Sequence, residues 1–277
     1  MPQPLTDIAA LARQRRRALA RADPARFLHD AAIAEVQERL ALVNRGFRSP
    51  ALVTGFAPFW APAFPGARIV RDDDRLALEP GAHDLVIHAM GLHWANDPVG
   101  QLVQCRRALR PDGMFLAIFF GGQTLQELRR VLADAEATLR GGLAPRVAPM
   151  GEIRDLGALL QRAGFALPVA DLVPLTATYA TLQDLLHDLR AMGETNALAA
   201  RDRRPLPRAV LDHAARQYSL AFGNSDGRLP ASFELILLTG WAPDASQQQP
   251  LRPGSATARL ADALGAEETP LPREPLD

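Results

Sequence analysis

The sequence predicts an α/β fold in which helices cover both faces of a largely parallel sheet. The main observation is the stretch 84–122, which reads as strand, crossover helix and strand. Apart from His88, the two strand segments, 85–89 and 114–120, are apolar at every position, as is typical of strands buried on both faces of a parallel sheet. An Arg-Pro-Asp-Gly turn at 110–113 then returns the chain from the helix into the second strand. These features indicate a βαβ unit, and ligands of such sheets bind beyond the carboxyl ends of the strands.

The composition is that of a globular protein with a sizeable core. The 277 residues are 48% hydrophobic and 22% charged, and 31 basic residues, all arginines, balance 31 acidic ones. A chain without net charge has no overall field that favours nucleic acid, which is therefore not expected as a partner. The single cysteine, Cys105, permits no internal disulfide and fits a reducing cytoplasm. No apolar run is long enough for a membrane span, so a cytoplasmic protein without an integral membrane segment is expected.

The N-terminal residues show a helical pattern, with Pro24 starting a second helix. The run RQRRR at 13–17 could contact an acidic partner or a membrane, but Asp7 and Asp23 dilute its charge, so a solvated helix face is favoured. The same acids argue against an organelle transit peptide. The expected divisions are an N-terminal helical segment at 1–48, an α/β domain at 49–242 with helical insertions at 122–163 and 181–222, and a mobile tail at 243–277.

Two short strands, 51–55 and 67–71, are expected before the central unit. A nucleotide-binding fold would place a glycine-rich turn after the first strand, but only Gly55 is present and prolines follow it. The second strand ends at Asp72 and Asp73, whose carboxylates could accept hydrogen bonds from an adenine amino group or a ribose hydroxyl. A charged turn is an equally weighted interpretation of these acids.

The remaining elements alternate after the central unit. Helices are predicted at 125–139, 153–163, 182–192 and 207–222, and strands at 165–173 and 233–239. His83, His88 and His93 recur every five residues, a spacing that places no set of ligands on one face of a strand or helix. Cys105 falls on a packing face, and no nucleophile elbow is visible. The sequence therefore predicts no metal site and identifies no catalytic residue.

Polar and aromatic residues gather where the central strands end. His93 and Trp94 could line a pocket for a planar ligand, or Trp94 could pack on the next helix while Asn96 or Asp97 caps that helix at Pro98. The doublet Gly121 and Gly122 allows close backbone approach after the second strand, or forms a simple turn. Glu194 and Asn196 follow a later helix and could reach a substrate.

Residues 84–129, DLVIHAMGLHWANDPVGQLVQCRRALRPDGMFLAIFFGGQTLQELR, resemble the second half of a class I S-adenosylmethionine-dependent methyltransferase. More narrowly, the chain resembles the branch of the mitochondrial complex I assembly factor and its alphaproteobacterial relatives, with malonyl-carrier-protein methyltransferases as more distant kin. The resemblance continues through GGLAPRVAPM at 141–150, DLGALLQRAGFALPVAD at 155–171, LRAMGETNALAARDRRPL at 189–206 and DGRLPASFELILLTGWAP at 226–243. It covers roughly residues 67–265.

That resemblance implies a seven-stranded sheet whose last strand is antiparallel. It also implies a cofactor site and a substrate or partner site. The cofactor residues would be Gly55, Asp72 opposite the adenine amino group, Asp73 beside it, and His88 and Ala89 near the methyl donor; the branch's own signatures are matched by His93, Trp94, Asn96, Asp97, Gly121 and Gly122. The implied function is S-adenosylmethionine-dependent methylation of a protein or carboxylated substrate. The eukaryotic relative is associated with hydroxylation of an arginine in a complex I subunit, so methyl transfer itself does not follow from the resemblance. The alternative is a catalytically inactive assembly factor for a respiratory-complex subunit.

The chain departs from this family in its first half. Where the family carries Asp-x-Gly-x-Gly-x-Gly, residues 52–58 read LVTGFAP. Only 29 positions separate Gly55 from Asp84, too few for two strands and two helices, so the strand bearing the ribose-binding acid is expected to be missing. A cofactor that keeps its adenine contact but loses its ribose and carboxylate contacts is expected to bind weakly or not at all.

Overall fold

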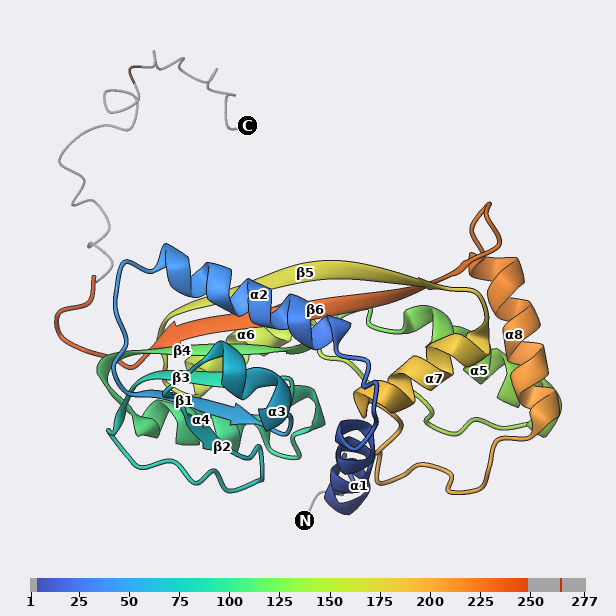
Figure 1. The fold of residues 1–277 in the computed structure, drawn as a ribbon, viewed down its shortest axis with the longest axis horizontal. Helices are drawn as coiled ribbons and strands as arrows, with labels where there is room; N and C mark the ends of the chain where they lie inside the picture. Colours follow the sequence, from blue (N-terminus) through green and yellow to red (C-terminus); the bar gives the residue numbers. More distant parts are fainter. Residues whose placement is uncertain (1–3, 249–264, 266–277) are drawn as a thin grey trace, which may run out of the picture. The chain divides into compact units, whose positions relative to one another are not determined.

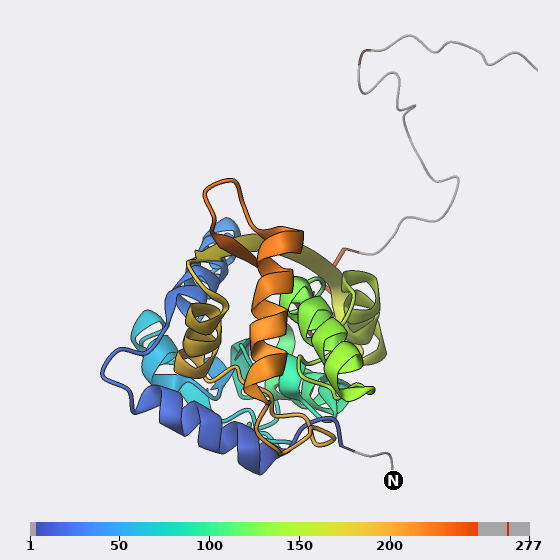
Figure 2. The ribbon, with the colours of Figure 1, turned by 90° about the vertical axis from the view of Figure 1, so that its right-hand side faces the viewer.

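The computed structural model describes residues 4–248 and residue 265. Met1–Asp244 form one compact unit, in which helices lie on both faces of a twisted sheet (Figures 1 and 2). The predicted tail at 243–277 lies largely outside the described residues, and the boundaries predicted near 48 and 242 remain predictions.

The sheet is mixed and has the order β2-β1-β3-β4-β6-β5, with six strands in the described residues. The strands are β1 (Pro50–Thr54), β2 (Arg68–Val70), β3 (His83–Ala89), β4 (Leu109–Phe120), β5 (Ala166–Tyr179) and β6 (Leu229–Trp241). Strands β2, β1, β3 and β4 pair in parallel, and β6 runs antiparallel to both β4 and β5. The parallel core and the antiparallel last strand confirm the predicted fold class.

Helices cover both faces because the central strands are apolar on both sides. The helices are α1 (Ile8–Leu19), α2 (Phe27–Leu42), α3 (Ala57–Trp60), α4 (Pro98–Ala108), α5 (Gln126–Arg140), α6 (Ile153–Arg162), α7 (Leu182–Met192) and α8 (Arg208–Phe222), with short 3₁₀ turns at Ala61–Ala63 and Leu92–Trp94. Helices α4 and α6 bury their apolar residues on one face, while α2, α3, α5, α7 and α8 do so on the other. Successive side chains of β4 point to opposite faces: Phe115 packs on the face covered by α4 and α6, and Leu116 packs on the other face.

The first half of the sheet is short, as the spacing predicts. Strand β2 pairs directly with β1, and only α3 and one 3₁₀ turn connect them. The six strands of the described chain therefore fall short of the seven that the resemblance implies. Phe56 and Trp60 are fully buried beneath α2, where the Trp60 indole N–H donates to His29 Nδ1 at 3.0 Å. The proline-rich segment thus fills the space with aromatic side chains.

Strand ends were the least predictable boundaries. The helix predicted at 182–192 coincides with α7, but β5 and β6 extend beyond the predicted 165–173 and 233–239. The extra residues of β5 alternate exposed and half-buried at the sheet edge, so no apolar run marks them. Residues 110–113, predicted as a turn, belong to β4, because Asp112 N–H donates to Ala242 O and Ala242 N–H donates to Gly113 O.

Candidate functional site

The N-terminal helix α1 closes the sheet at the carboxyl ends of β1, β2 and β3. Arg15 of α1 reaches Asp72, just beyond β2, with its Nη1 at 2.7 and 2.9 Å from the two carboxylate oxygens. Its Nη2 donates to the carbonyl oxygen of Met90 at 3.4 Å, and its guanidinium lies 5.0 Å from the Phe56 ring centre. Both ion-paired side chains are only 7% exposed. The pair is therefore a buried, hydrogen-bonded contact between the first helix and the end of the sheet.

This contact corrects the interpretation of residues 13–17 as a solvated helix face. Arg16 and Arg17 are exposed, but Arg15 is buried. The charge pattern could not reveal this, because the partner carboxylate lies 57 positions along the chain. The helix is also fixed at its start, where the Asp7 carboxylate accepts from Ala10 N–H and from Arg201 Nη2.

The residues at this place do not fit an adenosyl group. Both oxygens of Asp72 accept from Arg15 Nη1, so the guanidinium already holds the carboxylate that an adenine amino group would have to reach. A Cβ atom added to Gly55 would lie 2.2 Å from Arg15 Nη1, which shows that the guanidinium fills the space above the glycine. Phe56 follows Gly55 and is fully buried, where a glycine-rich turn would need open space for a ligand.

The other residues proposed to hold the cofactor take part in packing. His88 is buried, its Nε2 lies 2.8 Å from Gln101 Oε1, and Gln101 Nε2 donates to Asp73 O at 3.2 Å. Burial lowers the pKa of His88 and favours its neutral form. Ala89 is also buried and pairs with Ile118 of β4. These residues connect β3, α4 and the end of β2 within the core.

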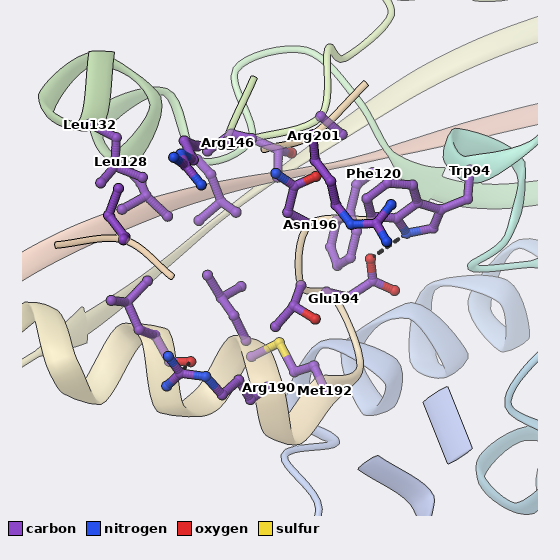
Figure 3. Close-up of a pocket in the computed structure, with 18 of the residues that line it drawn as sticks. Trp94, Phe120, Leu128, Leu132, Arg146, Arg190, Met192, Glu194, Asn196 and Arg201 are labelled. Carbon is purple, nitrogen blue, oxygen red and sulfur yellow. Dashed lines mark hydrogen bonds between the residues drawn. The ribbon is translucent and has the colours of Figure 1, made fainter. Parts of the chain in front are cut away.

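A cavity of about 730 Å³ lies beside this closed region (Figure 3). It is bordered by α5 and α7, by the ends of β4 and β6, and by the stretch between α7 and α8. Apolar side chains form much of its wall: Leu128, Leu132, Leu186, Leu189, Met192 and Phe233. Cavities of this size hold small molecules or a few side chains of a partner. Gly55, Asp72, Asp73, His88 and Ala89 do not line it.

Glu194 stands at the Trp94 end of the cavity (Figure 3). Its Oε2 accepts from Trp94 Nε1 at 2.7 Å and lies 3.1 Å from His93 Nε2. Burial alone would raise the pKa of Glu194, but His93 and Arg15 outweigh it and the pKa lies below its usual value. The second oxygen, Oε1, is buried without a hydrogen-bond partner in the described chain. The structure thus brings the predicted His93, Trp94 and Glu194 together around one ionised carboxylate.

Three other predicted residues hold the surrounding loops. Asn96 Oδ1 accepts from Thr6 N–H at 2.8 Å and so fastens the segment before α1. Asp97 caps α4 by accepting from Gly100 N–H at 2.8 Å, as the Asp-Pro pattern predicts. Asn196 lines the cavity, and its Nδ2 donates to Pro145 O at 2.7 Å.

The glycine doublet is required by close packing against β6. A Cβ atom on Gly121 would lie 2.4 Å from the Ile236 side chain. A Cβ on Gly122 would lie 1.8 Å from Glu234, and its φ of +53° also favours glycine. Neither glycine lines the cavity. The close approach at both glycines is therefore to side chains of β6.

Arginines at the cavity are functional candidates that the sequence reasoning missed. The lining includes Arg13, Arg146, Arg190, Arg201 and Arg203. Arg13 lies in the run at 13–17 and the others lie in segments that carry the family resemblance, but no local pattern marks any of them as a ligand-binding residue. Their convergence depends on tertiary structure alone.

The described residues contain no helix that is long and apolar enough to cross a membrane. Within the same residues, histidine, cysteine and carboxylate side chains form no cluster of three or more that could bind a metal ion.

Comparisons with known proteins link the chain to methyltransferases. Residues 60–117 match the family model described as methyltransferase domain. Arginine-hydroxylase NDUFAF5, mitochondrial, of Danio rerio is 37% identical over 198 residues, or 72% of this chain and 61% of that protein. The human protein of the same name is 36% identical over 198 residues, which cover 72% of this chain and 57% of that protein.

A second group of relatives acts on another class of molecule. Malonyl-[acyl-carrier protein] O-methyltransferase of Laribacter hongkongensis is 33% identical over 188 residues, covering 68% of this chain and 61% of that protein. The chain thus spans about three fifths of the length of these relatives. Among solved structures, YcgJ of Bacillus subtilis covers 76% of this chain and 98% of its own, with 14% identity and a TM-score of 0.47.

The relatives correct the expected location. A cytoplasmic protein was predicted from the single cysteine and the absence of a recognisable targeting segment, but the NDUFAF5 relatives are mitochondrial proteins. That finding points to mitochondria and the cytoplasmic prediction is wrong. A lone cysteine cannot distinguish two compartments that both keep thiols reduced.

Proposed function

We propose that this chain, which is similar to NDUFAF5 and to malonyl-carrier-protein methyltransferases, is a member of the class I methyltransferase superfamily that binds a polypeptide partner without transferring a methyl group. The single observation that carries this proposal is the Arg15–Asp72 pair. It occupies the acid that would face an adenine ring and fills the space above Gly55.

The cavity supplies the binding site of the proposal. It remains open beside the closed region, and Glu194 offers it an ionised carboxylate. A buried carboxylate is suited to a cationic side chain, because the charge pair forms in a poorly solvated place. The NDUFAF5 relatives are named arginine-hydroxylases, which supports a partner that presents an arginine. The resemblance to the complex I assembly factor favours a respiratory-complex subunit as that partner.

A calorimetric titration with S-adenosylmethionine and S-adenosylhomocysteine tests the proposal. We expect no binding heat from the wild-type chain even at roughly millimolar ligand. The same titration is run with Arg15→Ala, which removes the side chain above Gly55, and with Arg16→Ala, an exposed neighbour on the same helix, as the matched control. Binding tighter than about 100 μM that is lost in Asp72→Asn would contradict the proposal.

A second candidate is methyl transfer to a protein or carboxylated substrate. Two observations favour it: Asp72 and Asp73 persist at the end of β2, and Arg15 Nε and His88 Nδ1 are buried without partners in the described residues. A buried polar atom without a hydrogen bond destabilises the fold, and a polar ligand that hydrogen-bonds to Arg15 Nε or His88 Nδ1 would remove that cost. This candidate requires α1 to leave the sheet, and the same titration with the wild-type chain decides between the two.

A further inference from the structure

The mouth of the cavity is strongly cationic although the whole chain is neutral. Five arginines line the cavity against two carboxylates, those of Glu194 and Asp202. Arg146 is neutralised by Glu136 at 2.7 Å, and Arg201 by Asp7 at 2.9 Å. The positive charge of the mouth must therefore come from the remaining three arginines.

Those three arginines are exposed and poorly paired. Arg13 and Arg190 have no carboxylate within ion-pair distance in the described part of the chain. Arg203 is 76% exposed, and the carboxylate nearest to it, that of Asp7, lies 3.7 Å away and already binds Arg201. Such cations keep most of their charge available to a ligand.

The same three arginines come from separate parts of the chain. Arg13 lies on α1, Arg190 in the last turn of α7, and Arg203 in the stretch before α8. Figure 3 shows Arg190 on the α7 side of the cavity, across from Arg146 and Arg201. Because these cations lie on several sides of the mouth, a ligand with several separated negative charges can pair with all of them, whereas a ligand with one anionic head group can pair with only some.

We propose that this mouth docks an acidic, amphipathic segment of a partner polypeptide. Apolar side chains of the segment enter between Leu132 of α5 and Leu189 of α7, and its flanking carboxylates meet Arg13, Arg190 and Arg203. This inference rests on the proposed function and adds the charge of the partner to it. Glu194 lies inside the cavity and is negative, whereas the arginines at the mouth are positive. The docked segment therefore inserts its central residue towards Glu194 and carries its acidic residues on either side of it, at the mouth.

Fluorescence polarisation with three labelled peptides tests the inference. The probes share one central arginine and the leucine positions, and they carry glutamate, glutamine or lysine at the flanking positions. We expect the glutamate peptide to bind most tightly, and to weaken as sodium chloride rises from about 50 to 500 mM. Arg13→Glu/Arg190→Glu should weaken it about tenfold or more. Arg162→Glu on α6, an exposed arginine on the opposite face of the sheet, is the matched control and should leave it unchanged.

The outcomes separate this inference from the proposed function. Equal or tighter binding of the glutamine or lysine peptide overturns the acidic partner while leaving polypeptide binding intact. Binding of laurate, a single-headed carboxylated amphiphile, without binding of any peptide overturns both. A loss in Arg162→Glu as large as in the double variant, or no binding by any probe, also overturns the inference.

Discussion

Removal of the Arg15 side chain should destabilise the fold far more than its place in an arginine run suggests. In Arg15→Ala the Asp72 carboxylate would keep its buried position but lose the guanidinium that now lies at 2.7 and 2.9 Å. Met90 O would lose a donor, and the Phe56 ring would lose a cation 5.0 Å from its centre. The uncompensated carboxylate dominates the cost, because burial removes the water that would otherwise solvate it.

The expected magnitude follows from the burial of both partners. Breaking a buried, hydrogen-bonded ion pair by removing one partner costs about 3–5 kcal/mol. The cation over the Phe56 ring adds about 0.5–1 kcal/mol. For a chain of this length such a loss lowers the melting temperature by roughly 10 °C. Arg16→Ala, at an exposed neighbouring position, should change the stability by less than about 0.5 kcal/mol.

Chemical unfolding of four variants provides the assay. Arg15→Ala, Asp72→Ala, the double variant and Arg16→Ala are compared by their urea midpoints and slopes. Because Arg15 and Asp72 form one unit, the double variant should lose less than the sum of the single losses, by about 1–3 kcal/mol. If Arg15→Ala were as mild as Arg16→Ala, or if the two losses simply added, the reasoning about the closed site would be refuted.

Two further predictions concern buried titratable groups. Burial lowers the pKa of His29 to about 4, so the folded chain keeps it neutral while the unfolded chain takes up a proton below about pH 6.5. Stability should therefore be full above that pH and fall as the pH drops towards 4. In urea midpoints His29→Gln should flatten this slope, whereas His187→Gln, at an exposed position, should preserve it; an unchanged slope in His29→Gln would refute the assignment. Burial also raises the pKa of the Cys105 thiol, so Cys105 should resist a thiol-specific disulfide reagent in the native protein and react on unfolding; rapid native reaction would contradict its burial on the inner side of α4.

Much of the fold could be predicted because it depends on residues that are close together in the sequence. The apolar runs at 85–89 and 114–120 are the cores of β3 and β4, and the Asp97-Pro98 pair does start α4. The scarcity of glycine after β1 and the short spacing to Asp84 also predicted the missing strand. These are statements about neighbours in the chain, for which periodicity, caps and turn residues are sufficient.

The candidate site depended on contacts between distant segments. The sequence by itself predicted an α/β chain that resembles the methyltransferase family but lacks its glycine-rich turn, and it singled out His93, Trp94 and Glu194. Only the tertiary structure decided that Arg15 covers Asp72 and Gly55, where the family resemblance would put a cofactor, and that arginines from three segments surround the mouth of the cavity. The physical reason is that a charge acquires its role from the partner and the solvent around it. Both are set by packing between residues far apart in the chain, which no local pattern records.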